Sequence, residues 1–80
     1  MNRIVFTHSM IERLIYIDKS LRSKKYPNSN KLSKQLEVSV ATISRDIEFL
    51  RDRLQAPIEY NYSKKGYFYN GSYYLFENFK

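Results

Sequence analysis

The sequence predicts a mainly α-helical domain that carries a small β-hairpin near its C-terminal end. Three segments place apolar residues at the three- and four-residue spacing of an amphipathic helix, and a later segment alternates apolar and polar residues beside a turn. The length of 80 residues allows one domain with a single small core. We therefore expect three helices followed by two strands.

The first helix is expected over residues 9–24. Ser9 and Glu12 fit the capping-box pattern, in which a serine and a glutamate three residues apart satisfy free N–H groups at a helix start. Apolar residues at positions 10, 14, 17 and 21 then lie on one helical face. The helix should stop before Pro27, because proline disfavours helical backbone in the residue that precedes it.

Two further helices follow after short intervals. Asn28 is a favourable N-cap for a short second helix, and Ser39 is a favourable N-cap for a third. The apolar stripe of the third helix consists of Ile43, Ile47, Leu50 and Leu54. Two helices joined by so tight a turn form a helix-turn-helix unit. Glu37 stands in the turn where many such motifs have glycine, so we expect the turn to form without a left-handed residue.

Residues 57–70 change to the two-residue period of a strand. Ile58, Tyr60 and Tyr62 alternate with polar residues, a turn signal follows at 63–66, and residues 67–69 are again β-prone. A hairpin directly after a helix-turn-helix unit is a wing, so residues 1–70 are predicted to form a winged helix-turn-helix domain. Residues 71–80 form an aromatic tail, which packs back on the domain, packs against a second subunit, or links to a missing C-terminal domain.

The charge balance indicates a polyanionic partner. Lys and Arg number 14 against 8 acidic residues, which gives a net charge of +6 and a pI near 9.7. Six cations occur between positions 19 and 36 without an intervening acid: Lys19, Arg22, Lys24, Lys25, Lys31 and Lys34. This pattern favours nucleic acid over a membrane surface. Since no apolar run is long enough to cross a membrane and no secretory signal is present, we expect a cytoplasmic protein.

The residue types that most catalytic and metal sites need are scarce. Cysteine is absent, and the only histidine is His8, which excludes disulfides and thiolate metal sites and leaves little for a zinc enzyme or a serine hydrolase. No acid, base and nucleophile are grouped as catalysis requires. We expect no enzymatic activity, no metal and no cofactor.

The face of the third helix opposite its apolar stripe is the predicted reading surface. Ala41 is small enough for close approach to bases, and Arg45 can grip guanine with two hydrogen bonds or hold a phosphate. Glu48 and Asp52 repel phosphates, so the helix should enter DNA by its N-terminal half. The alternative for Arg45 is a surface pair with Glu48, whereas Asp46, nearer the buried edge, should have a structural partner.

The predicted DNA-binding residues lie on all three parts of the motif. They are Asn28, Lys31, Ser39, Val40, Ala41, Thr42, Ser44, Arg45, Lys64 and Lys65. Asn28 and Ser39 have the alternative role of helix caps, and Lys64 and Lys65 the alternative of solvated turn residues.

Residues 30–52 resemble the helix-turn-helix of type 11 and DeoR-like winged-helix regulators. The resemblance rests on Leu32-Ser33-x-x-Leu36-x-Val38-Ser39 and Thr42-Ile43-x-Arg45-Asp46-Ile47-x-x-Leu50. Ala56-Pro57-Ile58 with Gly66-Tyr67-Phe68-Tyr69 is similar to the wing of regulators that carry a WYL sensor domain. Over residues 9–75, the resemblance implies the reading head of a transcriptional regulator, bound to double-stranded DNA and acting as a homodimer in the full-length protein.

Two other functions stay open at this point. Because fold alone does not fix function, a winged helix can also serve as a protein-interaction module. Arg45 and the lysine cluster disfavour that function. The tyrosines of the hairpin could instead stack the bases of RNA or single-stranded DNA, although such residues more often pair across strands.

Overall fold

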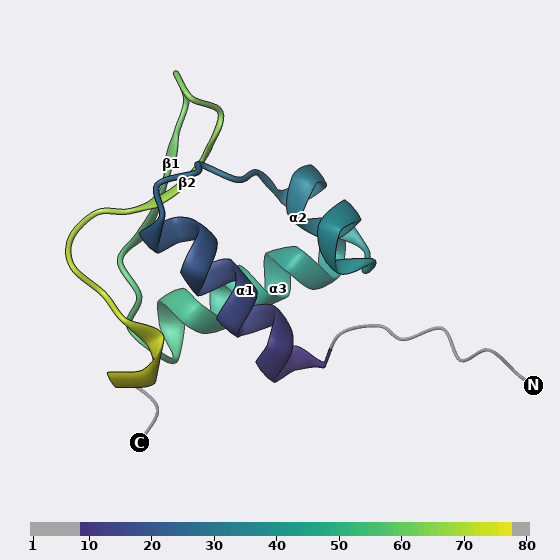
Figure 1. Ribbon diagram of the computed structural model, residues 1–80, viewed down its shortest axis with the longest axis horizontal. Coiled ribbons are helices and arrows are strands. Elements are labelled where there is room, and N and C mark those ends of the chain that lie inside the picture. The colour runs from purple at the N-terminus through teal and green to yellow at the C-terminus, as the bar shows by residue number, and fades with distance from the viewer. Residues whose placement is uncertain (1–8, 78–80) are drawn as a thin grey trace, which may run out of the picture.

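The computed structural model describes residues 9–77 and has the expected order of elements (Figure 1). The elements are α1 (Met10–Arg22), α2 (Ser29–Leu36), α3 (Val40–Asp52), β1 (Ile58–Asn61), β2 (Gly66–Tyr69) and a single 3₁₀ turn, η1 (Leu75–Glu77). Three helices and a two-stranded antiparallel hairpin confirm the winged helix. His8 and the ends of the predicted domain and tail, residues 1–8 and 78–80, lie outside the described residues.

Each helix has the N-cap residue that the sequence predicts. Ser9 Oγ accepts the Glu12 N–H at 3.2 Å, and the Glu12 carboxylate accepts the Ser9 N–H at 3.1 Å, which is a complete capping box. Asn28 caps α2 and Ser39 caps α3 by accepting the N–H of the residue three positions later, without the reciprocal bond of a capping box. The helix ends differ slightly from expectation, because α1 stops at Arg22 and α3 stops at Asp52.

The predicted apolar stripes meet in one core. Its buried members are Leu14, Ile17, Leu21, Leu32, Leu36, Ile43, Ile47, Leu50, Ala56, Ile58 and Leu75. Leu54 follows the end of α3 and is only partly buried. Leu75 is fully buried although it belongs to the aromatic tail, and the Tyr73 hydroxyl donates to the Leu54 carbonyl at 2.7 Å. Part of the segment 71–77 therefore packs against the helices.

The turn between α2 and α3 corrects one expectation. Glu37 has φ 58° and ψ 42°, so the turn does contain a left-handed residue even though it is not glycine. The Glu37 N–H donates to the Ser33 carbonyl, and the Val38 N–H donates to the same oxygen at 3.1 Å. These bonds close the end of α2 and place Val38 against the core. The closed, packed turn offsets the cost of the left-handed backbone.

The wing is fixed to the loop between α1 and α2. Ile58 pairs with Tyr69 and Asn61 with Gly66 in an antiparallel register. Strand β2 also bonds the loop, because the Tyr67 N–H donates to the Pro27 carbonyl at 2.8 Å. At Gly66 a side chain is impossible without movement, since a Cβ would lie 1.8 Å from the Tyr26 carbonyl oxygen. Glycine therefore serves close packing here, and the turn itself is formed by residues 62–65.

Two buried carboxylates tie α1 to the rest of the domain. Asp46 accepts two hydrogen bonds from Arg13, at 2.6 Å from Nε and 3.0 Å from Nη2, which joins α3 to α1. Asp18 accepts from Arg22 Nε at 2.8 Å and from the Tyr69 hydroxyl at 2.6 Å, which joins α1 to β2. Burial, together with the bond to Asp18, raises the pKa of Tyr69 well above its ordinary value. The structural partner expected for Asp46 is confirmed.

The described helices are all short. Among residues 9–77, none is both long enough and apolar enough to span a bilayer.

Candidate nucleic-acid interface

The N-terminal half of α3 presents a small, polar outer face. Ala41, Ser44 and Arg45 are exposed, Val40 is 41% exposed, and Thr42 is partly buried. The stripe of Ile43, Ile47 and Leu50 faces the core, as the sequence predicts. The outer residues that precede Arg45 have short side chains. A partner can therefore approach the helix backbone closely.

Arg45 is the free cation of α3. Arg51 Nε donates to the Ile58 carbonyl at 3.3 Å, and the Arg53 guanidinium lies 5.8 Å from the centre of the Phe49 ring. Arg45 makes no hydrogen bond or ion pair with another residue of 9–77, Glu48 included. It borders a hollow of about 520 Å³ beside the start of α3, at whose inner side Arg13 binds Asp46. A fully available guanidinium at this position suits guanine or phosphate.

The start of α3 also offers unused backbone donors. The Ser39 Oγ accepts the Thr42 N–H at 3.1 Å, and the two hydroxyls of Ser39 and Thr42 bond each other at 3.1 Å. Within the described chain, the N–H groups of Val40 and Ala41 have no hydrogen-bond acceptor. Free N–H groups at a helix start, at the positive end of the helix dipole, favour a phosphate oxygen.

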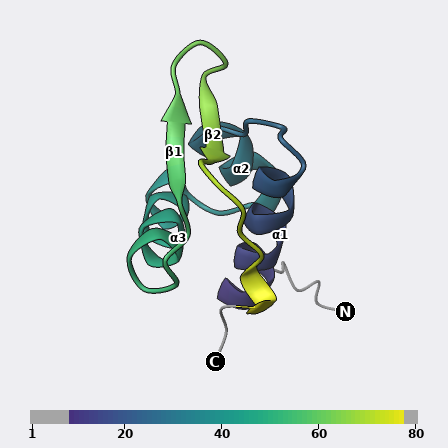
Figure 2. The same ribbon diagram turned by 90° about the vertical axis from the view of Figure 1, so that its left-hand side faces the viewer.

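The tip of the wing carries two lysines and an exposed aromatic ring. Asn61 Oδ1 accepts the Lys64 N–H at 2.8 Å, and Lys65 has φ 58°, which together shape the turn. The Lys64 ammonium lies 5.2 Å from the centre of the Tyr26 ring. Tyr62 is 83% exposed, and its ring packs edge-on against Tyr60 with centroids 4.9 Å apart. Figure 2 shows α3 and β1 on the same side of the molecule, with α1 on the other.

The comparisons with known proteins agree with this arrangement. A family model described as "HTH domain" matches residues 13–68, from α1 to the second strand of the wing. The chain belongs to this family of helix-turn-helix domains. No curated protein and no solved structure gives a significant match. The helix-turn-helix domain is a DNA-binding module, and α3 is the second helix of its motif, the one that enters the major groove in such proteins.

The start of α2 is the third part of the surface in this helix-turn-helix domain. Asn28 Oδ1 accepts the Lys31 N–H at 2.8 Å, so Asn28 has its alternative role as a cap and keeps its amide N–H₂ group for a partner. Lys31 is exposed on α2. Tyr26, which lies beneath the Lys64 ammonium, is two residues before Asn28. The loop therefore brings the wing lysine near the start of α2.

The structure divides the basic cluster that the sequence presents as one run. Lys31 and Lys34 are on α2, whereas Lys19, Arg22, Lys24 and Lys25 lie at the end of α1 and in the following loop. Arg22 is bound to Asp18 and its guanidinium lies 4.7 Å from the centre of the Tyr74 ring, so it has a structural role. Two residues of the helix-turn-helix domain were missed by sequence reasoning. Arg13 fixes α1 to α3, and Tyr62 appeared to belong to the packed face of a strand.

Proposed function

We propose that this domain is the reading head of a transcriptional regulator that binds a specific sequence of double-stranded DNA. The observation that carries the proposal is the unpaired Arg45 on an exposed helix face whose first turn has two free N–H groups. In the proposed complex, Val40, Ala41, Thr42, Ser44 and Arg45 meet base edges in the major groove. Asn28, Lys31, Ser39, Lys64 and Lys65 hold phosphates on either side.

The proposal extends to the regulator as a whole. The motif resembles DeoR-like regulators, and the wing sequence resembles those that continue into a WYL sensor domain. We therefore place the DNA-binding domain in residues 1–70, against which Tyr73 and Leu75 of the tail pack, and assign residues 71–80 as the segment that leads toward such a sensor. A full-length homodimer in the cytoplasm would place two heads on half-sites about one helical turn apart. Selection of bound sequences from a random duplex pool tests the proposal, because a paired-half-site consensus supports it and no enrichment contradicts it.

Tyr62 is the observation that favours the other nucleic-acid function. An exposed ring can stack on an unpaired base, whereas in a duplex it would pack against a sugar or donate its hydroxyl to a phosphate. We expect binding to duplex DNA to be tighter than binding to single strands. Tyr62 is the single strongly exposed tyrosine in residues 9–77, and one ring is too few to stack successive bases. Competition between a selected duplex and its separate strands distinguishes the two functions.

Binding to duplex DNA is expected to weaken steeply as salt rises. If the lysines and the start of α3 neutralise several phosphates, the logarithm of the association constant falls linearly with the logarithm of salt concentration, with a slope of about −0.9 per phosphate contact. Fluorescence anisotropy of a labelled duplex at five salt concentrations measures the slope. A slope near zero is incompatible with a phosphate-binding surface.

Arg45→Ala is expected to relax specificity, while Lys64→Ala weakens all duplexes alike. Loss of a bidentate guanine contact costs about 1–3 kcal/mol at one base position. Loss of a lysine that contacts phosphate as a point charge lowers affinity uniformly and reduces the salt slope by about one unit. Each variant is titrated with a selected and a scrambled duplex. If Arg45→Ala weakens binding to the two duplexes equally, Arg45 is a phosphate contact. The sequence is then read by Val40, Ala41, Thr42 or Ser44.

A further inference from the structure

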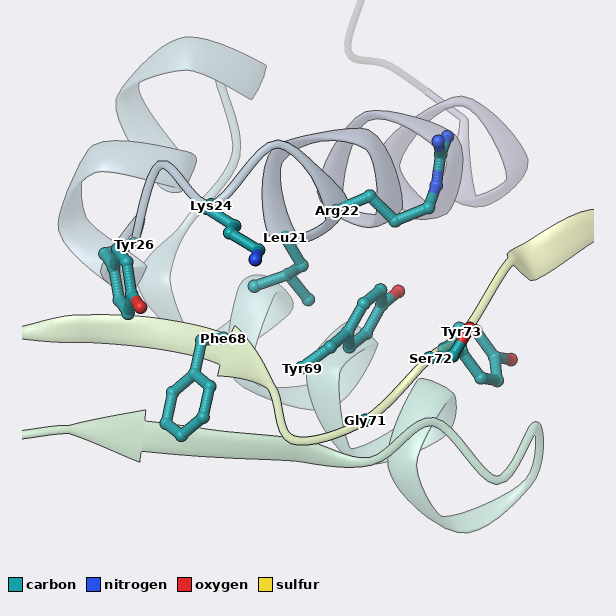
Figure 3. Close-up of a pocket in the computed structure, with 9 residues that line it drawn as sticks. All are labelled: Leu21, Arg22, Lys24, Tyr26, Phe68, Tyr69, Gly71, Ser72 and Tyr73. Carbon is teal, nitrogen blue, oxygen red and sulfur yellow. The ribbon is translucent and has the colours of Figure 1, made fainter.

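A second hollow lies between the end of α1 and strand β2, and none of the residues assigned to DNA lines it. Its volume is about 620 Å³, within the usual range for sites that hold a small molecule. Figure 3 shows the residues that line it: Leu21, Arg22, Lys24, Tyr26, Phe68, Tyr69, Gly71, Ser72 and Tyr73. None of them belongs to α2 or α3.

The lining combines aromatic rings with a free cation. The ring centres of Tyr26 and Phe68 lie 5.9 Å apart, and the ring planes are tilted by 37°. Buried Leu21 forms the apolar base of the hollow. The Lys24 ammonium points into the space between the rings of Tyr26 and Tyr69 (Figure 3). Lys24 makes no ion pair with any residue from 9 to 77. A flat apolar body with one negative charge matches this surface.

The remaining polar groups of the hollow do not oppose an anion. Asp18, whose carboxylate bonds two of the lining residues, is buried and already neutralised by Arg22, which it binds at 2.8 Å. The Tyr69 hydroxyl donates to Asp18, and the phenol is neutral at physiological pH because the ordinary pKa of tyrosine is about 10 and burial raises the pKa of Tyr69 further. An anion in the hollow therefore meets the Lys24 ammonium and neutral rings, while the Arg22 guanidinium is engaged with Asp18.

The wall of the hollow is also the support of the wing. Tyr26 carries the carbonyl against which Gly66 packs, and its ring lies under the Lys64 ammonium. Its neighbour Pro27 accepts the Tyr67 N–H. Phe68 and Tyr69 belong to β2 itself. A ligand that moves Tyr26 must therefore act on the position of the wing-tip lysine and on the loop that leads into the cap of α2.

We propose that this hollow binds a small aromatic carboxylate, and that binding there changes the affinity of the domain for DNA through the Tyr26 loop and the wing. The coupling half of this proposal rests on the proposed function, whereas the binding half does not. Coupling between two such sites typically changes affinity by about 5- to 150-fold.

The binding half is tested with 1-naphthoate as the probe and 1-naphthamide as its uncharged analogue. Amide chemical shifts of Gly71, Ser72 and Tyr73 are followed in a titration monitored by nuclear magnetic resonance. A ligand of this size bound with ordinary efficiency has a Kd of about 1 mM. Naphthoate should bind several-fold more tightly than naphthamide. Equal affinities, or no shifts of these amides at 10 mM probe (about ten times that Kd), overturn the assignment.

Variants then locate the charge. Lys24→Gln should weaken naphthoate binding about 3- to 5-fold, the effect of one exposed ion pair, and leave naphthamide binding unchanged. Lys19→Gln is the matched control, because Lys19 is an exposed lysine of α1 that does not line this hollow. Circular dichroism checks that both variants keep the parent fold. Equal effects of the two substitutions would assign the binding to general charge and overturn the site.

The coupling half is tested with a selected duplex titrated with and without saturating naphthoate. A change of five-fold or more supports the coupling when the naphthoate concentration that gives half of it rises about 3- to 5-fold in Lys24→Gln, and an unchanged affinity overturns it. The two proposals fail separately. A domain that binds no duplex in the absence of naphthoate contradicts the proposed function, while the chemical-shift titration still decides whether the hollow binds the carboxylate.

Discussion

Asp46→Ala should be among the most destabilising single substitutions in this domain. The Asp46 side chain is 3% exposed and binds Arg13 through two hydrogen bonds, and the Arg13 side chain is 14% exposed. Removal of the carboxylate takes away the group that accepts two hydrogen bonds from a largely buried guanidinium, which costs about 3–5 kcal/mol of unfolding free energy. Urea denaturation followed by circular dichroism measures the loss.

The paired replacement separates the cost of removing one member of the ion pair from the net contribution of the pair to stability. In Arg13→Met with Asp46→Leu, both charges are replaced by apolar groups of similar length, and stability should return close to that of the parent. Asp52→Ala is the matched control, since Asp52 is an exposed aspartate of the same helix and should change stability by less than about 0.5 kcal/mol. If Asp46→Ala and Asp52→Ala unfold at the same urea concentration, the ion pair does not hold α1 to α3.

The example of Asp46 marks where sequence reasoning succeeds and where it stops. Its place near the buried edge of a helical wheel predicts a structural partner, because a carboxylate there must be neutralised. The partner is Arg13, 33 residues earlier in the chain. No local pattern identifies it, since the pairing depends on how α1 crosses α3. Helix starts behave differently, because Ser9, Asn28 and Ser39 act on backbone groups only three residues away.

The wing shows the same division between local and long-range information. The strand period and the turn residues predict the hairpin, and the observed turn at 62–65 lies one residue before the predicted turn at 63–66. The reason for Gly66 is not local, because the glycine is required by the Tyr26 carbonyl of the α1–α2 loop. Tyr62 is exposed because the hairpin extends past the helices, which its alternating sequence does not reveal. The expectation that the turn at Glu37 avoids left-handed backbone was wrong. It rested on the conformational preference of a non-glycine residue, which takes no account of the packing of Val38 against the core.

The candidate interface was predictable to the extent that it depends on one helix. The buried stripe of α3 fixes which side is exposed, so Ala41, Ser44 and Arg45 follow from periodicity alone. Whether Arg45 is available depends on every possible partner in space. Two nearby arginines are not available in this way. Arg51 donates a hydrogen bond to the Ile58 carbonyl, and the Arg53 guanidinium lies over the Phe49 ring. Roles toward DNA for all of these residues stay predictions.

Ile47→Ala should lower the unfolding free energy by about 2–5 kcal/mol, because it removes buried methyl groups and leaves a cavity. Ile47 is 3% exposed and lies between Ile43 and Leu50 in the stripe of α3. For a domain of 80 residues, whose total stability is about 4–12 kcal/mol, that loss is a large share. Thermal and urea unfolding both report it.

The smaller change Ile47→Val keeps the prediction measurable if the alanine variant does not fold. It removes one methylene and should cost about 0.5–1.5 kcal/mol. Glu48→Ala, one residue later on the exposed face, is the matched control and should lie within about 0.5 kcal/mol of the parent. The unfolding free energy should rise from Ile47→Ala to Ile47→Val to the parent, and Glu48→Ala should match the parent. This order is expected if the stripe is packed in the core. If all four proteins unfold together, the face of α3 that packs on the core has been assigned wrongly, and Arg45 loses its place on the reading surface.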